Sequence, residues 1–271
     1  MLTTNVLNIV KNHGLYEHDI STIKRMGNII KVANLSAIRI NGLEDHQNVY
    51  AKGAINDSKL DNNIARAKSK VKEYVLCNEW DYFCTFTISP EKYDRYNFNL
   101  YYTDFSRFLR NYNRYCTEDE KVKYIFIPET HQDGAWHIHG FIKGIKIKDS
   151  YINKYGYLSW KQYEERFGFI SFAPIKNIEK SSNYILKYIT KDTSSNVSGL
   201  GNHIYYASKG LKSAELLYRG KIELNCDWDY ERPDGFCRLK YFDDRKDDLT
   251  EYIRVCVRFV KILSSLYRIT N

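Results

Sequence analysis

The regular alternation of strand-like and helix-like segments in the middle of this chain limits its possible folds more than any other sequence feature. Residues 82–88 are rich in aromatic and β-branched side chains, a composition typical of a β-strand. Residues 100–115 space their apolar side chains as an amphipathic helix does. Two further strands are predicted at 122–128 and 136–142, separated by turn-forming residues at 130–134, so these strands should form an antiparallel hairpin.

The remaining segments of this region complete the order of elements. The apolar spacing predicts a helix over residues 158–167, a strand over 169–172 and a second helix over about 179–191. The order β-α-β-β-α-β, followed by a helix, is that of the split βαβ, ferredoxin-like or RRM-like arrangement. We therefore expect an α+β fold with a central antiparallel sheet, helices packed on one face, and the other face free to host a site.

Extensions are expected on both sides of this core, because 271 residues exceed the roughly 100–200 of a typical domain. We predict a basic N-terminal extension at residues 1–78, a core at 79–192, and a C-terminal extension at 193–271 that packs on the core. Within the extensions, the patterns predict a strand at 28–40, a turn-rich stretch at 41–45, a helix at 61–77, strands at 203–208 and 236–242, and an amphipathic helix at about 249–267.

Composition excludes several classes of protein. Hydrophobic residues make up 43% and charged residues 27%, which rules out a mainly disordered or collagen-like chain. The longest apolar stretch, residues 252–267, contains three basic residues, whereas a membrane-spanning helix needs about 18 residues with few charges. No secretion signal is visible near Met1, and the six cysteines are scattered without the spacing of a metal finger. These features predict a cytoplasmic protein with reduced cysteines and no membrane partner.

The charge of the chain favours a polyanionic partner. The formal net charge is +8, and most of the excess lies in residues 1–72. Arg66, Lys68, Lys70 and Lys72 alternate along the predicted helix there and are candidates for contacts to DNA phosphates, although such a run also suits a solvated helix face. The 24 tyrosines would suit stacking on the bases of single strands.

Two histidines on the third predicted strand form the first candidate site. His137 and His139 lie two residues apart, so their side chains should leave the same face of the sheet. Glu129 ends the preceding strand, where a tight turn would place it beside the pair. Two imidazoles and a carboxylate leave open positions on a divalent ion, which could then polarise a phosphoryl oxygen. A lone His-x-His is also common without a metal, and His131, in the turn, is expected to be a solvated loop residue.

The second candidate site lies on the predicted helix 179–191. Tyr184 and Tyr188 are four residues apart, as are Lys187 and Lys191, so two phenols and two ammonium groups should lie on adjoining strips of the helix. A tyrosine oxygen can be a covalent nucleophile, but its ordinary pKa of about 10 requires a nearby cation for attack at neutral pH. A tyrosine repeated every fourth residue is also typical of a buried helix face.

Together and in this order, these residues resemble the HUH endonuclease superfamily, specifically the Rep proteins that initiate rolling-circle replication. Three family motifs have counterparts: residues 83–87 (Phe-Cys-Thr-Phe-Thr), His137-Ile-His139, and Tyr188-Ile-Thr-Lys191-Asp192. The doubled form, with Tyr184 ahead of Tyr188, is most like the initiators of small single-stranded DNA phages. The resemblance covers about residues 81–192 and is carried by the joint pattern.

The resemblance implies an HUH nuclease fold and a metal-dependent DNA nicking reaction. In that family the histidine pair and an upstream acid bind Mg²⁺ or Mn²⁺, and the tyrosine breaks a DNA strand to leave a 5′-phosphotyrosine and a free 3′-OH. The implied roles fall on His137, His139, Glu129 and Tyr188, with Lys191 assisting at the phosphate. The role of Tyr184 stays open, because two-tyrosine relatives use both phenols whereas single-tyrosine relatives have Tyr-x-x-Lys followed by an acid.

The resemblance also implies partners. Single-stranded DNA at a replication origin would be the substrate, with Thr85 and Thr87 of the first motif among its contacts. Residues 201–212 resemble a segment that follows the third motif in phage initiators, which adds Lys209 and Lys212, although a basic surface strand would look the same. The sequence has no GxxxxGK[ST] motif, so a host helicase is expected to open the duplex in the bacterial cytoplasm and a host polymerase to extend the 3′-OH.

Three other functions compete with this interpretation. A DNA-binding replication regulator could keep the fold without nicking. An HUH transposase shares the order of histidine pair and tyrosine, although the extensions at both ends favour a Rep protein. A hydrolytic zinc enzyme is disfavoured because no third His or Cys has ligand spacing.

Overall fold

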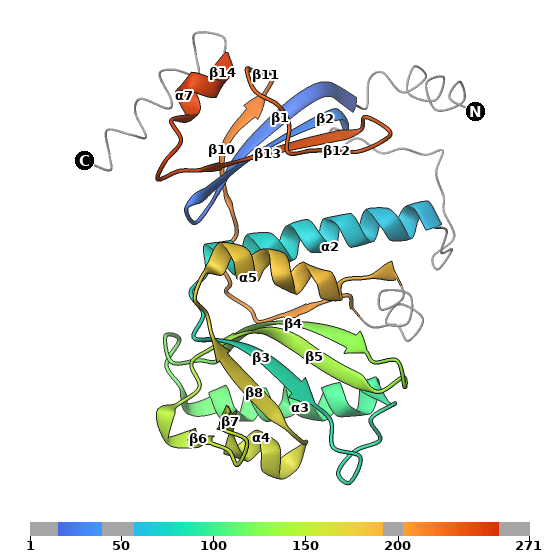
Figure 1. The fold of residues 1–271 in the computed structure, drawn as a ribbon, viewed down its shortest axis with the longest axis vertical. Helices are drawn as coiled ribbons and strands as arrows, with labels where there is room; N and C mark the ends of the chain where they lie inside the picture. Colours follow the sequence, from blue (N-terminus) through green and yellow to red (C-terminus); the bar gives the residue numbers. More distant parts are fainter. Residues whose placement is uncertain (1–15, 40–56, 192–202, 255–271) are drawn as a thin grey trace. The chain divides into compact units, whose positions relative to one another are not determined.

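The computed structural model describes residues 16–39, 57–191 and 203–254, which form two compact units (Figure 1). Residues 57–191 and 203–213 make up the larger unit, and residues 16–39 and 214–254 the smaller one. The boundaries differ from those expected at 78 and 192, because the helix before the core and the strand after it join the larger unit. The packing of a C-terminal extension on the core stays a prediction.

The larger unit is built on a seven-stranded antiparallel sheet with the order β6-β7-β8-β3-β5-β4-β9. Its four central strands, in chain order 4-1-3-2, have the arrangement of a split βαβ fold. The expected α+β fold with a central antiparallel sheet is therefore confirmed. The strands are β3 (Tyr82–Thr87), β4 (Lys123–Thr130), β5 (Trp136–Lys143), β6 (Ser150–Ile152), β7 (Leu158–Trp160), β8 (Ile170–Pro174) and β9 (Tyr206–Ala207).

Aromatic side chains fill the core on one face of this sheet. Helices α3 (Phe98–Tyr112) and α4 (Lys161–Arg166) cover that face, and a 3₁₀ turn, η1 (Asn113–Tyr115), extends α3 (Figure 1). The fully buried rings of Phe86, Phe105, Phe126 and Tyr163 pack against one another with centroids 4.9–5.8 Å apart. The hydroxyl groups of Tyr101 and Tyr163 lie 2.7 Å apart, so burial leaves neither phenol without a hydrogen bond.

The second face of the sheet is covered as well, contrary to the expectation of a free face. Helices α2 (Asp57–Cys77) and α5 (Ile178–Ile185) lie over it (Figure 1). Val71 and Val75 of α2 pack with Ile127 of β4 and Phe141 of β5, all fully buried. Strands β4 and β5 carry buried apolar side chains on both faces, which is the pattern of strands between two layers of helices.

Several elements differ in length from those predicted. Leu158–Trp160, expected to begin a helix, pairs with two strands as β7, so α4 begins only at Lys161. The helix expected over 179–191 ends as an α-helix at Ile185 and continues as the 3₁₀ turn η3 (Leu186–Tyr188). The strand expected at 203–208 is paired only at β9.

The smaller unit joins the two flanking segments of the chain in one five-stranded antiparallel sheet, with the order β10-β1-β2-β13-β12. Strand β2 and strand β13 confirm two predictions, whereas β1 and β10 were not predicted. The helix expected at 249–267 ends at Tyr252, after which β14 pairs with β11, and residues 41–45 and 255–267 lie outside the described residues. The elements are β1 (Tyr16–Met26), β2 (Ile29–Arg39), β10 (Glu215–Gly220), β11 (Glu223–Leu224), β12 (Tyr230–Glu231), β13 (Cys237–Asp243), α7 (Leu249–Tyr252) and β14 (Ile253–Arg254).

Gly140, directly after the histidine pair, is predicted to stabilise the fold because it lacks a side chain. A Cβ atom at this position would lie 2.2 Å from the carbonyl oxygen of Ile125 and 2.6 Å from Cδ1 of Phe126. Gly140→Ala should therefore destabilise the protein by at least about 2 kcal/mol, as overpacking of a buried site does. Gly156→Ala is the comparison, because its Cβ would meet no atom within 4 Å and only the φ of +81° opposes it, at about 1 kcal/mol. Equal losses in chemical denaturation would contradict the steric explanation.

Candidate active site

Three adjacent strands bring the predicted metal-ligand residues to one face of the sheet. In the register of β3, β5 and β4, Thr87 lies opposite His137, and His137 lies opposite Glu129. Two residues further along β5, His139 lies opposite Thr85. Since side chains alternate along a strand, both histidines share the face that α2 and α5 cover, as the sequence predicted.

Each histidine is held through its Nδ1 atom by a threonine of β3. The Nδ1 atom of His139 lies 3.2 Å from Oγ1 of Thr85, and that of His137 lies 3.2 Å from Oγ1 of Thr87. The Nε2 atom of His139 lies 2.7 Å from Oε2 of Glu129, a diagonal contact across the strand pair. A neutral His139 therefore donates its Nε2–H to the carboxylate and accepts the Thr85 hydroxyl at Nδ1. Thr85 and Thr87, expected among the DNA contacts, act here on the histidines.

The surroundings keep both imidazoles neutral. Burial, followed by the electrostatic influence of His131, His139 and Arg95, lowers the pKa of His137 to about 4. Burial and then His131 lower the pKa of His139 to about 4 as well. Burial also raises the pKa of Glu129. A neutral imidazole with a free nitrogen lone pair is the form that binds metal ions.

His131 has a closer relation to the site than the sequence indicated. Its side chain is exposed, as expected of a turn residue, but its ring stacks on that of His137 with centroids 3.7 Å apart and an interplanar angle of 15°. The hairpin between β4 and β5 brings the two rings together. The only sequence signal was the position of His131 in the turn before the pair.

The donor set fits a divalent cation in its chemistry. The two neutral imidazoles and the Glu129 carboxylate supply the nitrogen and oxygen donors expected of an open transition-metal or Mg²⁺ site. Within residues 16–39, 57–191 and 203–254, no three His, Cys, Asp or Glu side chains are gathered closely enough to hold a metal ion. Glu129 and His139 are in contact, and His137 lies on the same strand face opposite Glu129.

Tyr188 lies directly against this group. Its ring stacks on the His139 ring with centroids 3.8 Å apart and an interplanar angle of 8°. The Tyr188 hydroxyl donates to the Tyr184 hydroxyl at 2.9 Å, so the two phenolic oxygens occupy one location. Burial, the Tyr184 hydroxyl and the Glu129 carboxylate raise the pKa of Tyr188 well above its ordinary value. Tyr188 is therefore a protonated phenol at neutral pH unless a cation is present.

Tyr184 and the two lysines make contacts that the helical spacing did not predict. Tyr184 is 46% exposed and meets Phe83 edge-on, so it is no core residue. Nζ of Lys187 lies 5.1 Å from the Tyr184 ring centroid, in a cation–π contact. Nζ of Lys191 lies 2.8 Å from a carboxylate oxygen of Asp61 on α2. Because α5 ends at Ile185, the lysines do not continue one helical strip, and Asp61 is a partner that no sequence motif indicated.

The lysines predicted to contact DNA are dispersed over the larger unit. Lys70 donates to Glu73 at 2.6 Å and to Ser213 at 3.0 Å. Lys68 and Lys72 lie two residues from Lys70, which on a helix places them on a different face. The exposed Lys209 and Lys212 belong to the segment after β9, where the backbone of Lys212 is bonded to Asn78. The structure therefore brings together the candidate catalytic residues, whereas Lys68 and Lys72 leave α2 on a different face from Lys70, which lies beside Ser213 in the segment of Lys209 and Lys212.

One family model of known proteins matches part of the chain. Residues 81–193 match the family model of the replication-associated protein ORF2. The chain is similar to Rep-like replication proteins. The matched segment runs from β3 through Lys191 and so contains the histidine pair, Glu129 and both tyrosines. No curated protein and no solved structure matches the chain. The helices that the structure describes include none long and apolar enough to cross a membrane.

The protonation state of the histidines provides a direct test of this geometry. A histidine with an ordinary pKa of about 6.5 is mostly charged at about pH 5.5. His137 and His139, with pKa values lowered to about 4, should still be neutral there, and His139 should be protonated at Nε2. Titration of the imidazole ¹⁵N shifts by NMR in the metal-free protein measures both properties. Midpoints near 6.5 for the two rings would contradict the buried, threonine-held arrangement.

Proposed function

We propose that this protein is a tyrosine-dependent single-strand DNA endonuclease that nicks a replication origin and can rejoin the ends. The observation that supports this most directly is the stack of Tyr188 on His139, because it puts a potential nucleophile against the group best suited to hold a cation. The match of residues 81–193 to replication-associated proteins supports the same role. The site also has the features of an HUH nuclease, namely the histidine pair, an upstream acid and a following tyrosine.

The reaction we propose is a transesterification. The Tyr188 oxygen attacks a phosphorus atom of the DNA backbone, a tyrosine O–P bond forms, and the bond from phosphorus to the 3′ oxygen breaks. The Tyr184 hydroxyl, which accepts the hydrogen bond of Tyr188, gives the phenolic proton a path to solvent, and the departing 3′ oxygen takes up a proton. The products are a 5′-phosphotyrosine and a free 3′-OH, with the phosphoester bond energy conserved.

Glu129, His137 and His139 would hold the divalent ion, Mg²⁺ or Mn²⁺, through the carboxylate and the two Nε2 atoms. Such an ion, when bound, supplies Lewis-acid stabilisation of charge on the phosphate. The threonines keep the imidazoles oriented through Nδ1, as outer-shell partners of metal-bound histidines commonly do. Lys187 is close enough to the tyrosine pair to add positive charge there, whereas Lys191 would have to leave Asp61 to reach the phosphate.

Conservation of bond energy makes the reaction reversible. A free 3′-OH can attack the phosphotyrosine and restore a continuous strand, which is strand joining. Because the oxygens of Tyr184 and Tyr188 are 2.9 Å apart, either could reach a phosphate held at the same place, and Tyr184 is the candidate for a second transfer. In this proposal a host helicase opens the duplex, and a host polymerase extends the 3′-OH.

Tyrosine variants test the nucleophile. Tyr188→Phe removes one oxygen and keeps the ring stack, so the covalent protein–DNA adduct should fall below detection. Tyr184→Phe should still form the adduct but join strands less well. The assay incubates each full-length variant with a random-sequence single-stranded DNA library and Mn²⁺, and adducts are then resolved on a denaturing gel. An adduct that survives in Tyr188→Phe and disappears in Tyr184→Phe would reverse the assignment, and no adduct in the wild-type protein would favour a non-catalytic DNA-binding regulator.

Metal binding is tested separately from cleavage. The double variant His137→Ala/His139→Ala should lose Mn²⁺ binding measured by electron paramagnetic resonance, and Glu129→Ala should weaken it at least about tenfold. Glu118→Ala is the control, because this exposed carboxylate pairs with Lys121 in the turn before β4. Full Mn²⁺ affinity in the double variant would rule out the histidine pair as ligands, whatever the nicking activity.

A further inference from the structure

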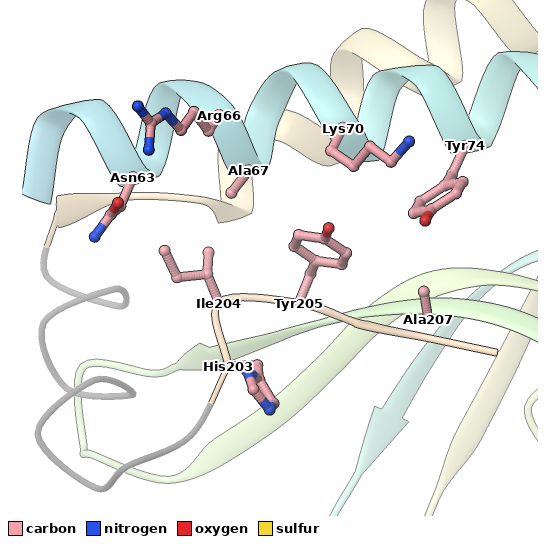
Figure 2. A pocket seen from close by; sticks show the side chains of 9 residues that line it. All are labelled: Asn63, Arg66, Ala67, Lys70, Tyr74, His203, Ile204, Tyr205 and Ala207. Atoms are coloured by element: carbon pink, nitrogen blue, oxygen red, sulfur yellow. The ribbon is translucent and has the colours of Figure 1, made fainter. Parts of the chain in front are cut away.

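A cavity of about 680 Å³ lies in the larger unit between α2 and the segment 203–207 that leads into β9. The residues that line it are Asn63, Arg66, Lys70 and Tyr74 on the helix and His203 and Tyr205 on the segment, and Figure 2 shows the rings of Tyr74 and Tyr205 facing the space between the two. Its volume is in the range of pockets that hold small organic ligands, about 300–1,000 Å³. All of these residues lie outside the segment 81–193 that matches replication-associated proteins.

Arg66 supplies the available positive charge of this cavity. Its side chain is exposed, and it makes no hydrogen bond or ion pair within the described part of the chain. Lys70, one turn further along α2, is bound to the buried carboxylate of Glu73 and to the Ser213 hydroxyl. Lys70 therefore neutralises Glu73, and the guanidinium of Arg66 remains to bind an anion, for which its planar fork suits a phosphate.

Two tyrosines give the cavity aromatic surfaces. Tyr205 points from the segment toward α2, and Tyr74 points from α2 into the same space (Figure 2). Nζ of Lys70 lies 4.5 Å from the centroid of the Tyr74 ring, which fixes that ring from one side. Tyr205 is half-buried and packs against the core beneath α2, so its ring is anchored while the cavity leaves part of it accessible. An anchored aromatic ring is the usual stacking partner of an unpaired base.

We propose that this cavity binds a nucleotide of single-stranded DNA, with its phosphate on Arg66 and its base on Tyr205. This inference rests on the proposed function, because the nucleotide would belong to the strand that Tyr188 cleaves. Helix α2 links the two sites: Asp61, which pairs with Lys191, precedes Arg66 by five residues, about 7.5 Å along a helix axis. A concave site between a helix and a strand segment admits an unstacked base, whereas the bases of a duplex are paired and stacked.

Photochemical cross-linking tests where the base lies. The full-length protein is irradiated with an oligothymidylate in which 5-iodo-deoxyuridine replaces one thymidine, and cross-linked peptides are identified by mass spectrometry. We expect cross-links at Tyr205 or Tyr74. Tyr115, which is 89% exposed on the turn after α3, controls for random reaction with accessible tyrosines. Cross-links at Tyr115 equal to or exceeding those at Tyr205 and Tyr74 would overturn the proposal.

Binding of fluorescein-labelled oligothymidylate without divalent ion tests the phosphate contact. Arg66→Ala should raise Kd about tenfold, the loss of one charge-assisted hydrogen-bonded contact. It should also reduce the slope of log K against log salt by about 0.7, the value for one phosphate of a single strand. Arg114→Ala removes the same charge from the exposed turn after α3, on the other side of the sheet, and should change neither. Equal effects of the two variants would mean that Arg66 affects binding only through the net charge of the protein, and would overturn the proposal.

The two proposals fail in different experiments. If the covalent adduct forms on Tyr188 but the cross-links and the Arg66→Ala binding data do not locate DNA in the cavity, the nuclease stands and the nucleotide site falls. If the cavity binds DNA as described but no adduct forms with Mn²⁺, the nicking function fails and a single-strand-binding protein remains.

Discussion

The pairing of β5 with β3 on one side and β4 on the other is the constraint from which the candidate site follows. This register places Thr87, His137 and Glu129 in one row across three strands, and Thr85 opposite His139 in the next. A shift of one residue would turn both histidines into the aromatic core on the other face. Gly140 is required for the close approach of β5 to β4, since a side chain there would collide with the backbone of Ile125. Backbone pairing therefore determines which side chains of the candidate site are neighbours.

Burial then determines the protonation of these groups. The helices α2 and α5 remove water from the face that carries the histidines, and the pKa values of His137 and His139 fall to about 4 while that of Tyr188 rises. In the metal-free protein, the proton on Nε2 of His139 forms a hydrogen bond with the Glu129 carboxylate, so these two candidate metal ligands are paired with each other. A cation in place of that proton would reverse the influence of Glu129 on Tyr188, because the carboxylate charge that opposes the phenolate would be neutralised. In the proposed reaction, metal binding would therefore also favour ionisation of the Tyr188 hydroxyl.

The sequence predicted the parts of this molecule that depend on local patterns. The four central strands of the larger unit, the antiparallel hairpin and the shared face of His137 and His139 follow from alternation and turn chemistry. The cover of α2 over the second face did not follow, because it depends on contacts of Val71 and Val75 with strands some fifty or more residues away. The sheet that joins β2 with β13 is equally non-local. The prediction that Lys187 and Lys191 lie on one helical strip was wrong, because it extended the helical repeat beyond Ile185, where the α-helix ends.

Different faces of helix α2 contact different parts of the larger unit, and its basic residues are divided between these faces. On an α-helix, residues four apart share a face and residues two apart do not. Val71 and Val75 therefore bind the sheet, Asp61 holds Lys191 beside the tyrosines, and Arg66 with Lys70 turns toward the segment before β9. Helix α2 lies outside the segment that matches replication-associated proteins. It covers the sheet face that carries the histidines, pairs with Lys191 through Asp61, and contributes Arg66 to the lining of the cavity. The alternating basic residues of the sequence therefore lie on two faces of α2, and Arg66 and Lys70 line the cavity between α2 and residues 203–207.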